Sequence, residues 1–173
     1  MDRGYTQIEG ARYTASSDTW SSLGTVQVVP AFSSVSAATA VVDSHGNITV
    51  AAGTGTSLYA VRWNAASSAW SLPGRIDHPV AISYLLSLRV AVDALDVVVA
   101  AWIQEDDDAG RSVYVARYDP VVGAWGTAQR AGTGAMQYMA MAIDTAGAIT
   151  VAWATGVSLS SSPTLWSSRW LPG

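Results

Sequence analysis

The stretch Ala91-Val-Asp-Ala-Leu-Asp-Val-Val-Val-Ala-Ala-Trp102, continued by Val113-Tyr-Val-Ala-Arg-Tyr118 and Gly123-Ala-Trp125, contains short apolar runs separated by polar turns. Its features recur along the chain. Turn aspartates lie at Asp43, Asp93 and Asp144, and Arg–aromatic pairs lie at Arg12-Tyr13, Arg62-Trp63, Arg117-Tyr118 and Arg169-Trp170. A tryptophan follows the first three of these arginines by eight residues, at Trp20, Trp70 and Trp125. A period of about 50 residues with four strand-like runs is typical of β-propeller blades.

The composition limits the class of protein. With 173 residues, the chain is long enough for one domain with a substantial core. Apolar residues make up 50% of it and charged residues only 13%. Its aliphatic residues are mostly Val and Ala, which suits sheets buried on both faces. The net charge of −4 argues against nucleic acid as a partner, because nucleic-acid binding needs a basic surface.

Cysteine is absent, which excludes disulfides and thiolate metal sites. No apolar run approaches the length of a membrane span, so no membrane partner is expected. The segment from Met1 to Tyr5 lacks the apolar core of a secretory signal. The composition favours an extracellular or bacterial-surface location if a signal was removed, and the cytoplasm otherwise.

The repeat predicts an all-β chain of four-stranded antiparallel blades in a single propeller domain. Strands are expected at residues 5–13, 20–29, 37–43, 48–52, 58–63, 70–76, 87–93, 97–103, 112–118, 124–131, 138–144, 148–154 and 164–170. These strands form a partial blade in 1–36, full blades in 37–86 and 87–136, and a partial blade in 137–173. The run 80–88 could form a helix locally, but its place in the repeat predicts a connector followed by a strand.

The first and last blades are both incomplete in this pattern. The fourth strand at 20–29 lacks a blade of its own, and the three strands after residue 137 lack an outer partner. Proteins seldom leave such sheet edges open. We therefore expect the N-terminal segment to complete the last blade of a second copy. About three blades per chain would then give six in a homodimer joined through its chain termini. The alternative is that residues 1–173 are a piece of a longer propeller.

The recurring Asp and Arg residues should emerge on one rim, about 10 Å apart across two strands. They form either an ion pair between blades together with a turn cap, repeated for packing, or a polar pocket between blades for sugar hydroxyls. The tryptophans either fill the wedge between blades or present an indole face to a sugar ring. The candidate ligand-binding residues are Arg12, Trp20, Arg62, Trp63, Trp70, Arg117, Tyr118, Trp125 and Arg169. Tyr13 and Trp170 share a repeated aromatic position and are expected to line the same crevices.

The sequence contains little that supports catalysis or metal binding. The acidic run from Glu105 to Asp108 lacks the alternate spacing of a calcium loop, so it predicts a solvated loop tip. His45 and His78 have no partner at metal-ligand spacing. No Gly-x-Ser-x-Gly or phosphate loop is present, and no serine is paired with a histidine in the repeat. We expect no enzyme activity, catalytic residue, metal or cofactor.

The repeat resembles a family of bacterial β-propeller repeats. The shared features are the Asp turn, strands ending in Ala-Ala-Trp102 and Val-Ala-Trp153, and the run Arg117-Tyr-Asp-Pro120 before Trp125-Gly126. More weakly, Leu58-Tyr-Ala-Val-Arg-Trp63 with Trp70-Ser-Leu-Pro-Gly74 is similar to lectin propellers, which bind sugars between blades through Arg, an acid and Trp. The resemblance implies a non-catalytic, carbohydrate-binding propeller with glycans as ligands. The alternative is a structural or protein-interaction scaffold, or a self-assembling fragment, without a ligand.

Overall fold

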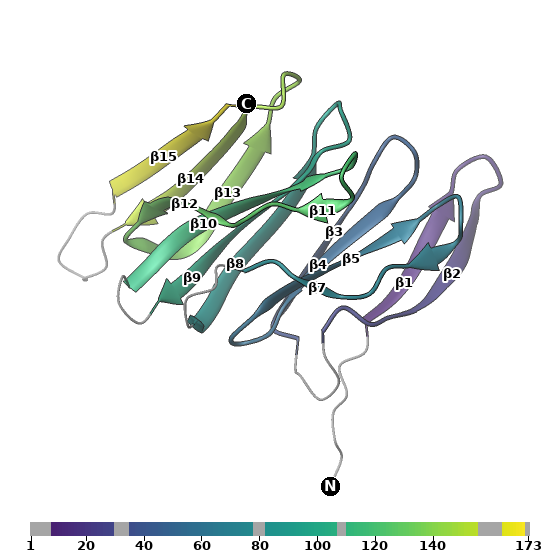
Figure 1. Cartoon of the computed structure of the whole chain (residues 1–173), viewed down its shortest axis with the longest axis horizontal. Coiled ribbons are helices and arrows are strands. Elements are labelled where there is room, and N and C mark those ends of the chain that lie inside the picture. Colours follow the sequence, from purple (N-terminus) through teal and green to yellow (C-terminus); the bar gives the residue numbers. More distant parts are fainter. Residues whose placement is uncertain (1–7, 30–34, 78–81, 107–109, 156–163, 172–173) are drawn as a thin grey trace, which may run out of the picture.

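A computed structural model of the chain describes residues 8–29, 35–77, 82–106, 110–155 and 164–171. Every regular element in these residues is a β-strand, which confirms the predicted all-β class (Figure 1). The strands are β1 (Ile8–Thr14), β2 (Thr19–Val26), β3 (Ala37–Val42), β4 (Ile48–Gly53), β5 (Leu58–Asn64), β6 (Ala69–Trp70), β7 (Gly74–Arg75), β8 (Ile82–Val92), β9 (Val98–Asp106), β10 (Gly110–Asp119), β11 (Ala124–Trp125), β12 (Gln129–Thr133), β13 (Ala135–Ile143), β14 (Ile149–Thr155) and β15 (Thr164–Trp170).

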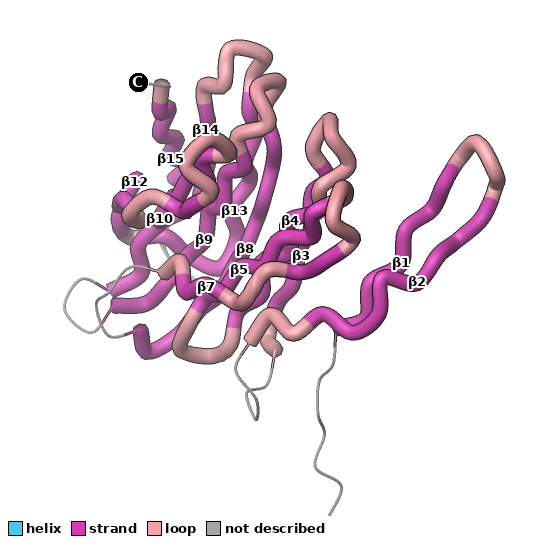
Figure 2. Tube along the Cα trace, turned by 45° about the vertical axis from the view of Figure 1, so that its right-hand side comes forward, coloured by secondary structure: helices cyan, strands magenta, loops and turns pink. Residues whose placement is uncertain are grey.

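The strands form four small antiparallel sheets, which we call A to D. Sheet A pairs β1 with β2. Sheet B has the order β3-β4-β5, and both β6 and β7 pair with β5. Sheet C repeats this arrangement with β8-β9-β10, and both β11 and β12 pair with β10. Sheet D contains β13-β14-β15. The sheets follow one another across the molecule, from β1 and β2 to β15 (Figure 1), and the far end of β1–β2 stands clear of the others (Figure 2).

The strands differ from those expected in several bounds: β2 ends at Val26 instead of residue 29, β9 extends to Asp106 and β13 begins at Ala135. Two further differences are larger. The fourth strands of sheets B and C are interrupted rather than continuous, and in sheet B the gap contains Pro73, which has no N–H for a ladder hydrogen bond. Strand β8 begins at Ile82 instead of residue 87, because its first residues pair with the extended end of β9. The start of the ambiguous run 80–88 lies outside the described residues, but from Ile82 onward it is strand.

The turn between the first two strands of sheet B has the predicted construction. Asp43 Oδ1 accepts hydrogen bonds from the backbone N–H groups of His45 and Asn47, at 3.0 and 2.8 Å. Gly46 has φ +78°, a left-handed conformation that glycine adopts without strain. In sheet C the same turn position is Asp96, which has φ 62°. The repeat thus fixes the turn geometry even where glycine is replaced.

Three apolar clusters lie between successive sheets. Val26 and Val28 pack with Val50 and Val61 between A and B. The B–C cluster includes Leu58, Leu88, Trp102 and Tyr114. The C–D cluster includes Ile103, Val113, Ile149 and Trp153. Sheets B and C therefore have an apolar cluster on each face, as the Val- and Ala-rich composition predicted, although alternate residues of β3 are exposed.

Gly132 on β12 provides the space for the indole of Trp153 on β14. A Cβ atom at Gly132 would overlap Trp153 Cζ2. Replacing Gly132 with alanine should therefore force the tryptophan out of its packing position and lower the free energy of unfolding by about 1–3 kcal/mol. Gly55 is the matched control, because a Cβ there meets nothing within 4 Å. Urea denaturation checks the prediction, and equal stability of the G132A and G55A variants would contradict it.

Candidate functional site

Each turn aspartate forms an ion pair with the repeated arginine of its own sheet. Arg62 Nη2 contacts Asp43 Oδ2 in sheet B. The Arg117–Asp93 distance in sheet C is 3.8 Å, and Arg169 Nη2 lies 2.7 Å from Asp144 Oδ2 in sheet D. The arginine thus spans from the third strand to the turn after the first. The expected ion pairs are therefore present, but each lies within one sheet and not between blades, because the arginine reaches the turn of its own sheet.

The Asp43–Arg62 pair is the most deeply placed of the three. The Asp43 side chain is 1% exposed, whereas Asp144 and Arg169 are 42% and 61% exposed. Burial alone would raise the pKa of Asp43, but hydrogen bonds from Asn47 and the charge of Arg62 outweigh it and lower the pKa. Backbone hydrogen bonds, the largest from Ala148, lower the pKa of Asp144. Both aspartates are therefore held in the charged form.

The same arginines also contact the following sheet. Arg62 Cζ lies 4.9 Å from the ring centre of Tyr118, and Arg117 Cζ lies 5.7 Å from that of Trp170. Arg12 lies at the turn of the sheet after its own, because a Cβ at Gly46 would be 3.1 Å from Arg12 Nη2. A guanidinium can donate from its edge to a carboxylate while its face lies on an aromatic ring. These side chains therefore connect neighbouring sheets.

The repeated tryptophans form a second set of structural contacts. Trp63 with Trp70, and Tyr118 with Trp125, make edge contacts with ring centres 5.4 and 5.7 Å apart. Trp70 Nε1 also donates to the carbonyl of Leu23 in sheet A. In sheet A the matching pair is Tyr13 and Trp20, 5.4 Å apart, but Trp20 is 72% exposed. Most of the candidate ligand residues are thus occupied by contacts within or between sheets.

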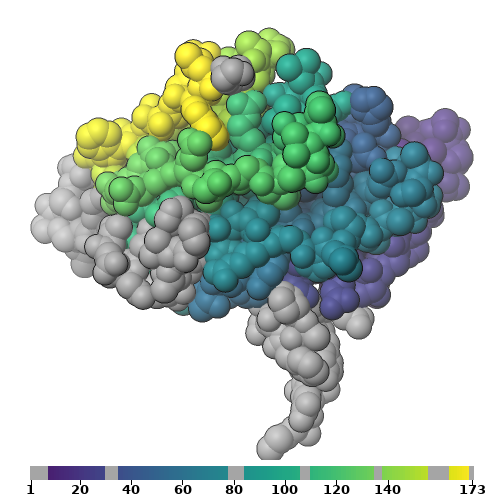
Figure 3. Space-filling view, in the orientation of Figure 1, coloured from purple at the N-terminus to yellow at the C-terminus, as the bar shows by residue number. Residues whose placement is uncertain are grey.

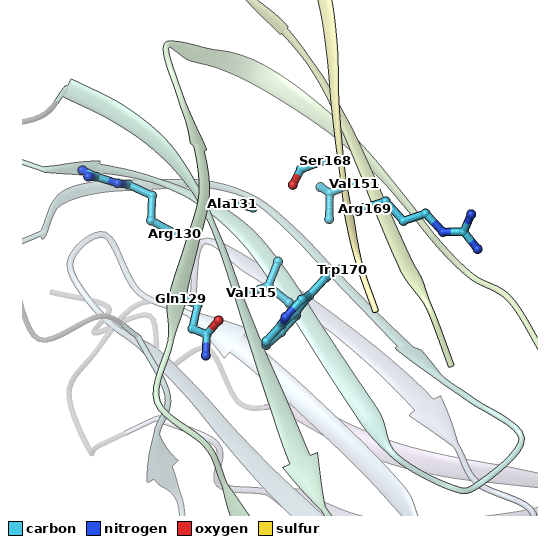
Figure 4. Close-up of a pocket in the computed structure, with 8 residues that line it drawn as sticks. All are labelled: Val115, Gln129, Arg130, Ala131, Val151, Ser168, Arg169 and Trp170. Carbon is cyan, nitrogen blue, oxygen red and sulfur yellow. The ribbon is translucent and has the colours of Figure 1, made fainter. Parts of the chain in front are cut away.

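A crevice of about 130 Å³ lies between sheets C and D, beside β12 and β15 (Figure 4). Its lining residues are Val115, Gln129, Arg130, Ala131, Val151, Ser168, Arg169 and Trp170. The Trp170 ring lies near Gln129 and Val115, while the charged ends of Arg130 and Arg169 point away from the centre (Figure 4). The crevice thus combines apolar contacts with an amide, a hydroxyl and an indole.

Arg169 is the one candidate ligand residue among those lining this crevice. Trp170, which holds the repeated aromatic position next to that arginine, also lines it. Neither Gln129 nor Ser168 belongs to a repeated position, so neither was predicted as a site residue. Gln129 and Ser168 lie near the same crevice because the outer strand of sheet C crosses the edge of sheet D. The repeat does not specify this crossing. The remaining candidates lie in the ion pairs and aromatic pairs described above, except Arg12, which lies at the Gly46 turn.

Asp96 makes a contact between sheets B and C that was not predicted from the sequence. Its carboxylate accepts hydrogen bonds from Ser44 N at 2.8 Å and Ser44 Oγ at 2.7 Å, and His45 Nδ1 lies 2.8 Å from it. The hydrogen bonds from Ser44 lower the pKa of Asp96, and His45 contributes further. Asp43, His45 and Asp96 place ligand atoms within 4.8 Å of one another. The Arg62 guanidinium already neutralises Asp43, so the cluster is built as an ion-pair network.

The acidic run on β9 and after it is only partly described. Glu105 forms an ion pair with Arg111 across the strand pair, at 2.8 Å. Residues 107–109 and His78 lie outside the described residues.

Among the residues described, no helix is long and apolar enough to cross a membrane. Neither a protein-family model nor a curated protein matches this sequence.

The burial of Asp43 makes its arginine partner a sensitive position. Replacing Arg62 with methionine leaves a buried carboxylate without its counter-charge, so we expect a loss of roughly 3 kcal/mol in the free energy of unfolding. Arg169→Met at the same repeat position should change stability much less, because that pair is screened by solvent. Urea denaturation of both variants measures the difference. Equal losses of stability in the two variants would contradict the prediction that the more buried ion pair matters more.

Proposed function

We propose that this chain is a non-catalytic β-propeller scaffold that binds a partner at sheet D. The observation that supports this proposal is the outer edge of β15. In sheets B and C the equivalent strands, β5 and β10, pair with an interrupted fourth strand. Within the described residues, β15 pairs with β14 alone. Sheet D therefore offers free backbone N–H and C=O groups to an extended segment.

Propeller architecture is the interpretation that best fits the sheets. Sheets B and C have the first-to-fourth strand order of a blade, and successive sheets pack face to face. The resemblance of the repeat to bacterial propeller repeats supports the same architecture. Strands β13, β14 and β15 then correspond to the first three strands of a further blade.

The crevice next to β15 is the place where a fourth strand would insert its aromatic side chain. In sheets B and C, the tryptophan that opens the fourth strand contacts the aromatic residue next to the repeated arginine. On β15 that aromatic residue is Trp170, which lines the crevice. An extended segment with a tryptophan can therefore pair with β15 and pack its ring beside Trp170.

The crevice supports binding rather than chemistry. Its lining residues include no carboxylate and no histidine that could act as a general base. Ser168 alone is a weak nucleophile, because a serine hydroxyl needs an adjacent base to be activated. The same residues therefore suit recognition of a ligand or strand.

Carbohydrate binding in this crevice is the second candidate function. An indole face accepts the C–H face of a sugar ring, and the Gln129 amide and Ser168 hydroxyl can bind sugar hydroxyls. A volume of about 130 Å³ is small beside the several hundred Å³ of drug-sized sites. We therefore propose that the ligand of such a site is a single ring at the end of a glycan.

A labelled peptide with the sequence of residues 69–76, the fourth strand of sheet B, distinguishes these functions. The scaffold proposal predicts saturable binding that Trp170→Ala weakens up to about tenfold, through loss of an aromatic contact. Trp166→Ala on the same strand is the control, since Trp166 donates to Thr155 instead of lining the crevice. Fluorescence anisotropy measures the peptide affinity, and circular dichroism verifies that both variants are folded.

A glycan array with the same proteins is the second arm. Glycan binding that is lost in Gln129→Ala, without peptide binding, would support the carbohydrate function and contradict the scaffold. Absence of both peptide and glycan binding would contradict both functions.

A further inference from the structure

The fourth strand of sheet B is joined to β5 by two pairs of hydrogen bonds. In the first pair, the Ser71 N–H donates to the carbonyl of Arg62 at 2.8 Å, and the Ser71 hydroxyl accepts from the Arg62 N–H at 3.0 Å. In the second, the Ile76 N–H donates to the carbonyl of Leu58 at 2.9 Å, and Asp77 Oδ1 accepts from the Leu58 N–H at 3.1 Å. A serine and an aspartate thus each accept from a backbone N–H of β5. We call a fourth strand with these two residues a B-type strand.

Sheet C holds its fourth strand without these side chains. Gly126 takes the position of the serine, one residue after the repeated tryptophan, and its N–H donates to the carbonyl of Arg117 at 2.8 Å. Gly132, seven residues after that tryptophan, takes the position of the aspartate. Neither glycine has a side-chain oxygen that could accept a hydrogen bond. The two fourth strands therefore bind their sheets by different chemistry.

Sheet D resembles sheet B and not sheet C in the strand that supports this edge. Its second strand begins with Ile149-Thr-Val-Ala152, and β4 begins with the same four residues, Ile48-Thr-Val-Ala51. In sheet C the corresponding residues are Val98-Val-Ala-Ala101. The likeness favours a B-type strand as the partner of sheet D.

The third strand of sheet D presents the backbone groups that a B-type strand binds. The register of β15 on β14 is that of β5 on β4, so Arg169 corresponds to Arg62. Leu165 corresponds in the same way to Leu58. Because alternate residues of an antiparallel strand bond to the same neighbour, the N–H and C=O groups of Arg169 and Leu165 point away from β14. Both residues are exposed, so an extended segment can reach these groups.

The crevice at Trp170 has the surroundings that the tryptophan of a B-type strand has in sheet B. There the Trp70 ring contacts Trp63, and its indole N–H donates to the carbonyl of Leu23, on the outer strand of the preceding sheet, at 3.2 Å. Trp170 holds the position of Trp63 on β15, and Gln129, on the outer strand of the preceding sheet C, borders the same crevice (Figure 4). A tryptophan inserted here would lie between the same two elements.

We propose that sheet D recognises a B-type segment of a protein partner: Trp-Ser, four further residues, an apolar residue and Asp. The serine binds both backbone groups of Arg169, the apolar residue and the aspartate bind those of Leu165, and the tryptophan enters the crevice at Trp170. This inference rests on the proposed scaffold function and specifies the sequence that its site recognises.

Peptides of residues 69–77 with single substitutions test this sequence requirement and leave the protein unchanged. Ser71→Ala removes the hydroxyl acceptor and Asp77→Ala the carboxylate acceptor, so each should weaken binding by about twofold to tenfold. Leu72→Ala is the matched control, because Leu72 is 90% exposed in sheet B, and this peptide should bind as tightly as the unchanged one. Fluorescence anisotropy measures the four affinities.

Amide hydrogen exchange, followed by NMR, reports which backbone groups the unchanged peptide binds. Exchange of the Leu165 and Arg169 N–H groups should become slower when the peptide is added. Ser168 and Trp170 are the internal controls, since their N–H groups point toward β14 in the same ladder and should change little.

The outcomes separate this inference from the scaffold function. Equal affinities of the unchanged, Ser71→Ala and Asp77→Ala peptides, with slower exchange on β15, would overturn the sequence requirement and leave the scaffold function standing. Binding without slower exchange at Leu165 and Arg169, or no binding at all, would overturn both.

Discussion

Arg62, near the end of the third strand of sheet B, connects three parts of the structure at once. Arg62 contacts Asp43 in the turn after the first strand and donates to Thr49 Oγ1 on the second strand at 2.8 Å. The face of its guanidinium lies on Tyr118 of the next sheet. A planar, permanently charged group with several donors can satisfy all three contacts, which a lysine could not. This arrangement connects the strands of sheet B to one another and sheet B to sheet C, and Arg117 likewise connects sheet C to Trp170 of sheet D. The far end of β1–β2 and sheet D lie at opposite ends of this series of sheets (Figure 3).

The sheets can approach closely because the residues between them are small. Ala51 and Ala60 of sheet B meet Ala100 and Ala116 of sheet C in the same cluster. Larger side chains occupy only selected places, as when Trp153 uses the space left by Gly132. The Asp96–Ser44 contact adds a polar connection at the rim of the same B–C junction. Apolar packing and the Asp96–Ser44 contact therefore both hold sheets B and C at a fixed distance.

The sequence predicted the parts of this structure that repeat. The turn aspartates, the strand following each turn and the bounds of β15 agree with the structure because each follows from local spacing. The double role of the arginines was only half predicted: the ion pair was one of two interpretations, and the ring contact depends on the rotation between sheets. The contacts of Asp96 could not be predicted, because its partners lie some 50 positions away in the sequence. The crevice at Trp170 was unpredictable in detail, because it arises from two strands that share no local pattern.

Arg62 and Arg117 connect neighbouring sheets as well as strands within a sheet. The most direct test is a double-mutant cycle of Arg62→Met and Tyr118→Leu, with the free energy of unfolding measured in urea for all four proteins. The structure predicts a coupling of about 1 kcal/mol between these two residues, which lie in different sheets. Additive losses with no coupling would contradict the account, since Arg62 would then act within sheet B alone.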